Sequence, residues 1–206
     1  MVYPFAKFLL LPIPRIWVRS IKGLENIPKI GPALLAANHA SFLDPYVIYC
    51  YAIPYTGRKI YSVATKSLFK GNRLKRALLS RWMACIPTNG SIKKVVQELK
   101  KRNLVLIFPE GTRSYDGKLL KARTGAAAIA LLSRVPVIPI GIAGTHEVWP
   151  VQRRLPKLGK VVRIRIGAPL YFRRYYGKRP TRAILEQVNR RIMREIAKLA
   201  GKKYKW

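Results

Sequence analysis

The fold of this chain is indicated first by the stretch Ala33-Leu34-Leu35-Ala36-Ala37-Asn38-His39-Ala40-Ser41-Phe42-Leu43-Asp44-Pro45. Its first five residues are apolar and follow Gly31-Pro32, so they predict a short buried strand. Asp44 and Pro45 predict the start of a helix, with Asp44 as the N-cap and Pro45 at the first helical position. His39 is therefore expected in the loop that leaves a strand, where α/β folds tend to place their chemistry.

The pair His39 and Asp44 suggests acid–base chemistry. Imidazole is the side chain whose unperturbed pKa lies nearest neutrality, which makes it the usual general base. A carboxylate bound to its other ring nitrogen would fix the tautomer and stabilise the imidazolium. The alternative is that Asp44 only caps a helix and His39 is an ordinary loop histidine. This pair alone leaves both interpretations open.

A second stretch of the same kind is Leu104-Val105-Leu106-Ile107-Phe108-Pro109-Glu110-Gly111-Thr112-Arg113-Ser114. Its five leading apolar residues predict another buried strand, which the proline and the glycine end. A carboxylate, a hydroxyl and a guanidinium follow just past the strand. The planar fork of Arg113 matches two phosphate oxygens, and Gly111 lets the backbone come close to a ligand.

Together the two stretches resemble the glycerolipid acyltransferase family, of the lysophosphatidic acid acyltransferase type. The family's Asn-His-x4-Asp block matches residues 38–44, and its Phe-Pro-Glu-Gly-Thr-Arg-Ser block matches residues 108–114. An apolar run around a proline, residues 135–140, resembles a further block, and the lead-in at residues 22–28 is also similar. The resemblance extends from about residue 21 to residue 168. It implies catalysis by His39 and Asp44, and binding of the acceptor phosphate by Glu110, Gly111, Thr112 and Arg113.

One block departs from the family pattern. It usually ends in an arginine that helps to hold the acceptor phosphate, and Asn89 stands at the matching place. An amide can donate a hydrogen bond but has no charge, so the identity of the acceptor stays open. Lys66 resembles a family lysine near the same phosphate, although a solvated surface lysine is the alternative. A helix expected to begin at Ser91 offers free N–H groups as a second anion site.

The composition demands an anionic partner. The 206 residues include 41 Lys and Arg against 8 Asp and Glu, which gives a formal net charge of +33. Nucleic acid, anionic lipid headgroups and acidic substrates would all satisfy this charge. No zinc-finger spacing or aromatic-rich basic sheet motif is present, so no nucleic acid is expected. Cys50 and Cys85 are predicted to be buried thiols, and no Cys/His spacing suits a metal.

The order of the segments predicts one α/β domain over residues 21–206. Strands are expected at 60–64, 84–87, 137–142 and 161–166, and helices at 67–82, from 91, at 124–132 and at 181–200. This alternation predicts a two-layer or three-layer sandwich with a largely parallel or mixed central sheet flanked by helices. Residues 1–20 are apolar but broken by Pro12 and Pro14, which predicts a membrane-interface segment, with packing on the core as the alternative.

The expected function is transfer of an acyl chain from acyl-CoA or acyl carrier protein to the free hydroxyl of 1-acylglycerol 3-phosphate, which makes phosphatidic acid. No cofactor or metal is expected. The protein should be peripheral or monotopic on the cytoplasmic face of a membrane and bind an anionic surface. Alternatives are acylation of another lysolipid or of glycerol 3-phosphate, and a lipid hydrolase that uses the same dyad. A non-enzymatic protein that binds anionic lipid or nucleic acid is a further alternative.

Overall fold

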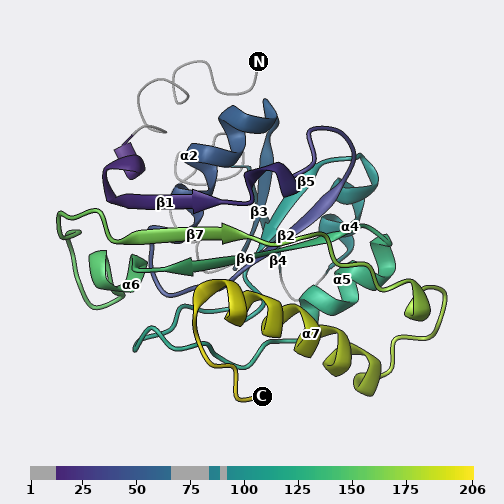
Figure 1. Ribbon diagram of the computed structural model, residues 1–206. Helices are drawn as coiled ribbons and strands as arrows, with labels where there is room; N and C mark the ends of the chain where they lie inside the picture. The colour runs from purple at the N-terminus through teal and green to yellow at the C-terminus, as the bar shows by residue number, and fades with distance from the viewer. Residues whose placement is uncertain (1–12, 66–83, 89–91) are drawn as a thin grey trace.

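A mixed β-sheet forms the centre of the computed structural model, which describes residues 13–65, 84–88 and 92–206. Within these ranges the chain forms a seven-stranded sheet with the strand order β1-β7-β6-β2-β5-β3-β4 (Figure 1). The strands are β1 Val18–Lys22, β2 Ala33–Ala37, β3 Ile60–Thr65, β4 Cys85–Thr88, β5 Leu104–Ile107, β6 Val137–Ala143 and β7 Val162–Ile166. Strands β2 to β6 are mutually parallel, whereas β7 runs antiparallel to β6 and pairs in parallel with β1.

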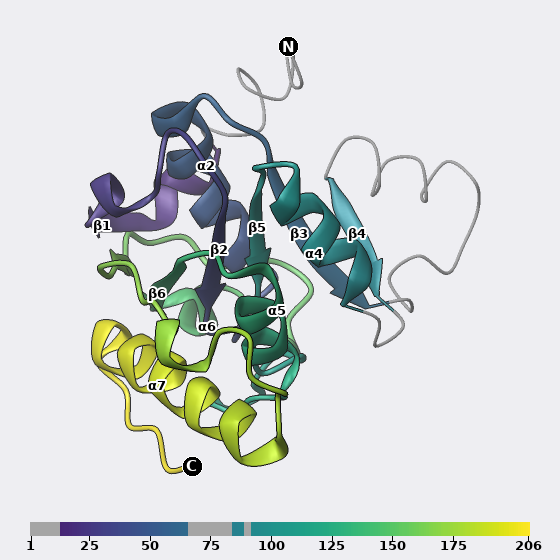
Figure 2. The ribbon, with the colours of Figure 1, turned by 90° about the vertical axis from the view of Figure 1, so that its right-hand side faces the viewer.

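Helices cover both faces of this sheet, so the molecule has three layers, as Figure 2 shows. On one face lies α2, together with the short 3-10 helices η1 and η2, and on the other lie α4, α5 and α7. The helices are η1 Ile13–Trp17, η2 Leu24–Asn26, α2 Asp44–Thr56, α4 Lys93–Lys100, α5 Gly125–Ser133, α6 Thr145–Val148, η5 Arg173–Tyr175 and α7 Arg182–Ala200. The predicted α/β sandwich is confirmed, in its three-layer form.

Strand β2 lies in the middle of the sheet and has no exposed residue. Leu34 faces the helices α5 and α7, and Leu35 faces α2, because successive side chains of a strand point to opposite sides. Leu35 pairs with Leu106 of β5 and Ile138 of β6. A parallel strand covered on both faces is apolar throughout. Because β2, β5 and β6 are parallel, the loops that leave them meet at one edge of the sheet.

Helix α7 covers β6 with the apolar face that its sequence pattern predicts. Val188, Ile192 and Ile196 on this face are fully buried. The side chain of Thr181 accepts a hydrogen bond from the backbone N–H of Ile184 at the start of the helix, and Gly201 ends it with a φ of 66°.

Helix α2 differs in detail from the expected start. Asp44 is its first residue and Leu43 is its N-cap, so the prediction that Asp44 caps the helix is wrong by one position. The reason is that the Asp44 carboxylate turns back into the preceding loop, where it accepts hydrogen bonds from the backbone N–H groups of Ala40 and Ser41. Asp44 therefore organises the loop rather than the helix.

Other expectations concern the N-terminal boundary of the domain, the cysteines and contact with a membrane. Trp17 and Val18 are buried, and β1 continues across the boundary expected after residue 20. Residues 1–12 and the helix expected at 67–82 lie outside the described residues, so membrane contact by the N-terminus stays a prediction. The helix that was expected to be capped by Ser91 begins at Lys93 with Ile92 as its N-cap, so that prediction is wrong by one position. Both cysteines are buried, as predicted. In the part of the chain that the structure describes, no helix has the length and apolarity to cross a membrane.

Candidate active site

His39 and Asp44 lie side by side in the loop between β2 and α2. The Nδ1 atom of His39 is 2.8 Å from Oδ2 of Asp44. The Asp44 side chain is fully buried, whereas 18% of the His39 side chain is exposed. A buried carboxylate therefore holds an imidazole whose ring still reaches solvent, which is the arrangement that a general base needs.

The hydrogen bonds at Asp44 decide which ring nitrogen of His39 is protonated. Oδ2 also accepts bonds from the backbone N–H groups of Ala40, at 2.7 Å, and Ser41, at 2.8 Å. An ionised carboxylate only accepts hydrogen bonds, so Nδ1 is the donor to Oδ2. In the neutral ring, Nε2 is then left with a lone pair that can take a proton.

Two neighbours hold the His39 loop in place from the sheet side. The ring of Phe108 stacks on the imidazole, with 3.9 Å between centroids and 16° between planes. The amide of Asn38 donates to the carbonyl oxygen of Ile142 and accepts from its N–H, at 2.9 and 2.8 Å. The Asn38 side chain thereby makes the two hydrogen bonds to β6 that the backbone of β2 no longer makes after Ala37. Neither role was predicted from the sequence, although both residues belong to the recognised blocks.

Glu110 joins the loop after β5 to the His39 loop. Its Oε1 accepts from the backbone N–H of His39 at 2.8 Å, and its Oε2 accepts from that of Leu120 at 2.7 Å. Burial raises the pKa of Glu110 to about 7, although the two N–H donors act in the opposite direction. With both oxygens occupied by the backbone, Glu110 positions His39. Its expected part in substrate binding stays a prediction.

The remaining residues of this loop shape its outer side. Gly111 has a φ of 72°, and a Cβ atom there would lie 2.8 Å from Cδ of Arg123, so the position suits glycine. Thr112 is exposed. Arg113 lies over the ring of Phe42, with Cζ 3.5 Å from the centroid. Its Nη1 atom is buried and has no hydrogen-bond partner among the described residues.

A guanidinium with an unpaired buried donor is suited to an anionic ligand. Burial lowers the pKa of Arg113, and the charge of Asp44 acts against this shift. Leaving a charged donor without a partner costs free energy, which a bound phosphate would recover. The structure thus brings His39, Asp44, Glu110, Gly111 and Arg113 to one edge of the sheet. Lys66 and Asn89, the other expected phosphate ligands, lie outside the described residues.

A further loop, which contains Trp149, packs against the loop of His39 and Asp44, and no sequence pattern predicted it. The Ser41 hydroxyl donates to the carbonyl oxygen of Trp149 at 2.6 Å, and the rings of Phe42 and Trp149 lie 5.7 Å apart. The backbone N–H of Ser114 donates to the carbonyl oxygen of His39 at 2.9 Å. Residues from the ends of β2, β5 and β6 therefore surround His39. Such contacts between distant residues are set by the topology, not by local patterns.

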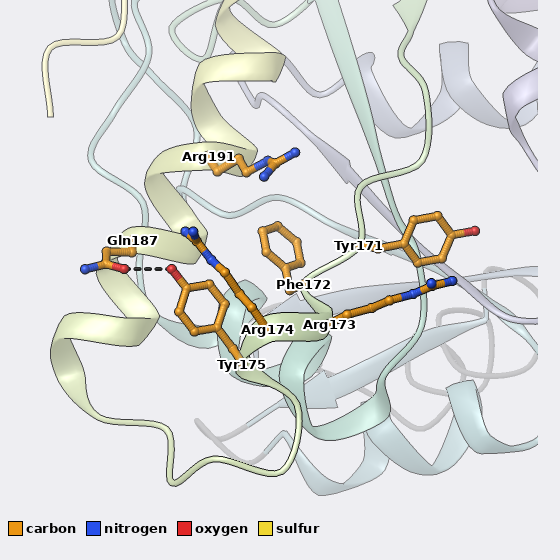
Figure 3. A pocket seen from close by; sticks show the side chains of 7 residues that line it. All are labelled: Tyr171, Phe172, Arg173, Arg174, Tyr175, Gln187 and Arg191. Atoms are coloured by element: carbon orange, nitrogen blue, oxygen red, sulfur yellow. Dashed lines mark hydrogen bonds between the residues drawn. The ribbon is translucent and has the colours of Figure 1, made fainter.

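Two pockets lie outside this constellation. One, of about 260 Å³, is formed at η5 and the start of α7, where the hydroxyl of Tyr175 donates to Gln187 (Figure 3). The other, of about 520 Å³, lies beside Asp116 and His146, next to the loop that follows Arg113. His39 lines neither. No group of three His, Cys, Asp or Glu side chains that could hold a metal occurs in the described ranges; the absence of a metal stays a prediction.

Comparison with known proteins gives consistent results. A family model described as Acyltransferase matches residues 18–143. The chain is 30% identical over 180 residues to a 1-acyl-sn-glycerol-3-phosphate acyltransferase of Bacillus subtilis. This match covers 84% of this chain and 85% of that protein. It is also 33% identical over 178 residues to a chloroplastic 1-acyl-sn-glycerol-3-phosphate acyltransferase of Brassica napus. This match covers 82% of this chain and 47% of the relative.

A solved structure is also similar. The crystal structure of the 1-acyl-sn-glycerophosphate (LPA) acyltransferase, PlsC, from Thermotoga maritima matches with a TM-score of 0.69 and 26% identity. The match covers 90% of this chain and 73% of that chain. Against the first plant relatives, in contrast, the chain spans about half of the length or less.

Proposed function

We propose that this chain, which belongs to the acyltransferase family, transfers an acyl group from a thioester to the free hydroxyl of a 1-acylglycerol 3-phosphate. The product is phosphatidic acid, a precursor of phospholipids. The donor is an acyl-CoA or an acyl carrier protein, and the chemistry needs no cofactor. The names of the relatives support this acceptor. The observation that carries the proposal is the geometry of His39 and Asp44.

The reaction follows from the free Nε2 of His39. This atom takes the proton of the acceptor hydroxyl as the hydroxyl oxygen attacks the thioester carbonyl carbon. Asp44 stabilises the imidazolium that forms, because its Oδ2 holds Nδ1 at 2.8 Å. When the carbon–sulfur bond breaks, the imidazolium returns the proton to the leaving thiolate. Proton transfer of this kind typically accelerates a reaction by about 10²- to 10⁴-fold.

Arg113 is assigned to the acceptor phosphate. The buried Nη1 of its guanidinium lacks a partner within the described ranges, and arginine can offer two parallel donors to a phosphate. Glu110 and Gly111 support this role by fixing the loop from which Arg113 projects. Thr112, Lys66 and Asn89 are proposed as further contacts to the acceptor, on the resemblance alone.

The proposed site of action is the surface of a membrane. The acceptor is a membrane lipid, and the net charge of +33 favours anionic lipid headgroups. Cytoplasmic leaflets present such lipids, and they attract basic protein surfaces by about 1 kcal/mol for each Lys or Arg near the membrane. We therefore place the protein peripherally, or monotopically, on the cytoplasmic face.

Competition between acceptors tests this assignment. Lysophosphatidic acid, lysophosphatidylcholine and glycerol 3-phosphate are mixed with an acyl thioester, and the acylated products are quantified by mass spectrometry. Phosphatidic acid should be the main product. Arg113→Lys, which keeps the charge but loses the fork, should raise the KM for lysophosphatidic acid by about tenfold, the value of one lost charged hydrogen bond.

Arg194→Lys, at an exposed position of α7, is the matched control and should leave the KM unchanged. Acylation of lysophosphatidylcholine or glycerol 3-phosphate alone would contradict the acceptor assignment but keep the acyltransferase. Release of free fatty acid with no acylated product would favour the hydrolase.

A further inference from the structure

The loop between α6 and β7, residues 149–161, exposes apolar side chains among basic ones. Leu155 and Leu158 are 76% and 87% exposed. Four exposed cations are interleaved with them, namely Arg153, Arg154, Lys157 and Lys160. The loop contains no Asp or Glu. Exposed leucines that are surrounded by cations combine the two attractions that hold a protein on an anionic bilayer, which are burial of apolar surface and neutralisation of lipid charge.

The backbone of this loop is fixed by hydrogen bonds at its base. The N–H of Lys157 donates to the carbonyl oxygen of Val148 at 2.9 Å, and the carbonyl oxygen of Lys157 accepts from the indole of Trp17 at 2.6 Å. The indole of Trp149 donates to the carbonyl oxygen of Arg153 at 3.0 Å. These bonds attach the backbone of the loop to residues of the core, whereas the side chains of Leu155 and Leu158 stay exposed.

The base of the loop also contacts both loops of the active site. The carbonyl oxygen of Trp149 accepts from Ser41, which lies between His39 and Asp44 in the sequence. The side chain of Gln152 donates to the carbonyl oxygen of Tyr115 at 3.1 Å, two residues after Arg113. Figure 1 shows the loop at the edge where β6 ends and β7 begins. The leucines therefore lie on the side of the molecule on which the dyad is found.

Helix η1 enlarges this surface. Trp17, the residue that holds Lys157, is its last residue, and Ile13 and Ile16 of the same helix are 49% and 46% exposed. Two segments that lie 140 positions apart in the chain are therefore joined by this bond, and each of them exposes apolar side chains. We call Ile13, Ile16, Leu155 and Leu158 the insertion surface.

We propose that the insertion surface docks on an anionic phospholipid bilayer, with Leu155 and Leu158 entering the boundary between headgroups and acyl chains. The four cations of the loop then meet lipid phosphates, and the active site faces the membrane that holds its acceptor. A bilayer fits better than an acidic protein, because the leucines are interleaved with cations along the loop and line neither of the two pockets described above. The biological purpose of this docking rests on the proposed function, because that function requires access to an acceptor in the membrane.

Co-sedimentation with vesicles tests the docking directly. Vesicles of phosphatidylcholine with about 30% phosphatidylglycerol are spun down with the full chain and with Leu155→Ser/Leu158→Ser. Loss of two leucines from a membrane boundary should lower the partition coefficient by at least about tenfold. Ile30→Ser is the matched control, because Ile30 is 81% exposed and precedes β2, at the opposite edge of the sheet. An unchanged partition coefficient for the double variant, or an equal loss in the control, would overturn the proposal.

The cations of the loop are tested separately with Arg153→Gln/Arg154→Gln. This variant should bind anionic vesicles several-fold more weakly than the unmodified chain and should bind pure phosphatidylcholine vesicles equally. Equal weakening on both kinds of vesicle would contradict a role of lipid charge. All of these side chains are exposed, so the melting temperatures should stay within about 2 °C of the unmodified chain.

An activity measurement separates docking from catalysis. The leucine variant should acylate a short-chain lysophosphatidic acid, dissolved as monomers, at the normal rate, and a long-chain acceptor in vesicles at least about tenfold more slowly. An equal loss on both acceptors would mean that the leucines serve the active site, and it would overturn the docking. If the unmodified chain acylates neither acceptor, the proposed function fails, while co-sedimentation still decides the docking.

Discussion

His39 and Asp44 are five positions apart, and the short loop between them directs three hydrogen-bond donors at one carboxylate oxygen. The donors are Nδ1 of His39 and the backbone N–H groups of Ala40 and Ser41. This convergence requires a turn directly before α2, which begins at Asp44. The same turn therefore sets both the start of the helix and the tautomer of His39. A carboxamide would fit the space, and its oxygen could accept the same bonds, but it carries no negative charge.

Replacing Asp44 by asparagine should therefore separate fold from catalysis. In Asp44→Asn, the imidazole loses the negative charge that stabilises the imidazolium, so kcat for thiol release should fall at least about a hundredfold. Glu186→Gln makes the same chemical change at an exposed ion pair of α7 and should have no effect. If Asp44→Asn keeps more than about a tenth of the rate, Asp44 has only a structural role.

The raised pKa of Glu110 should make the free energy of unfolding depend on pH. Burial raises its pKa from 4.5 to about 7 in the folded chain. Between these values the folded state binds more protons than the unfolded state, so the free energy of unfolding should fall as the pH rises from about 4.5 to 7. At 1.36 kcal/mol for each pKa unit, this contribution amounts to about 3 kcal/mol.

Glu110→Gln, which does not titrate, supplies the comparison. Urea unfolding at about pH 4.5, 6 and 7.5 should show the unmodified chain losing more stability than the variant across this window. Parallel curves for the two proteins would mean that the Glu110 carboxyl has no raised pKa in the folded state.

The chemistry at single residues was partly predictable from the sequence. The spacing of His39 and Asp44 left a dyad and a plain helix cap both open, and only the second block, at residues 108–114, favoured the dyad. The bonds from Glu110 to His39 and Leu120 were not predictable, since they span 71 and 10 positions and depend on how two loops cross. The direction of the Asp44 side chain was misjudged, because an Asp-Pro pair usually indicates an N-cap.

At the level of elements, close approach of α7 to β6 completes the core. A Cβ atom on Gly141 of β6 would lie 2.3 Å from the backbone nitrogen of Ala200. Neither strand nor helix can shift alone, because β6 is paired on both sides and α7 buries Val188, Ile192 and Ile196 in the core. Glycine at this position therefore sets the distance between the sheet and the helix.

Gly141→Ala should accordingly be destabilising. The added methyl group meets backbone rather than a flexible side chain, so the free energy of unfolding should fall by about 2–3 kcal/mol. Gly125→Ala is the matched control, because no atom lies within 4 Å of the added carbon in α5. It should be neutral or stabilising by up to about 1 kcal/mol. Equal effects of the two substitutions in chemical denaturation would contradict the close approach.

Elements with a strong pattern were predictable, and pairings between distant elements were not. The apolar run of β2, the alternation of Arg163 and Arg165 with buried residues in β7, and the apolar face of α7 each follow from local periodicity. The parallel pairing of β1 with β7 does not, because it joins Val18 to Val162 across most of the chain. The prediction of a largely parallel or mixed sheet was correct, but the strand order required the structure.

At the scale of the whole molecule, charge and architecture act together. The net charge of +33 attracts the chain to any anionic surface. Charge alone does not orient a protein, whereas the exposed leucines of residues 149–161 mark one edge of the sheet. The same edge contains His39 and Arg113, so in the proposed docking attraction and orientation would both bring these residues towards the membrane.

Binding to anionic vesicles should therefore depend strongly on salt. Raising the salt concentration from about 0.1 M to about 1 M shortens the Debye length from about 10 Å to about 3 Å. The fraction of protein that co-sediments with phosphatidylglycerol-containing vesicles should fall severalfold, while binding to pure phosphatidylcholine should change little. Binding that is independent of salt would contradict attachment through the net charge.

The proposed function depends most on His39 as the general base. The decisive measurement is acyl transfer from an acyl thioester to lysophosphatidic acid, with the released thiol and the acylated lipid counted in the same sample. The unmodified chain should form one phosphatidic acid for each thiol released, and His39→Ala should be slower by at least about a hundredfold with an unchanged fold. Product formation by His39→Ala at a rate near that of the unmodified chain would contradict the account.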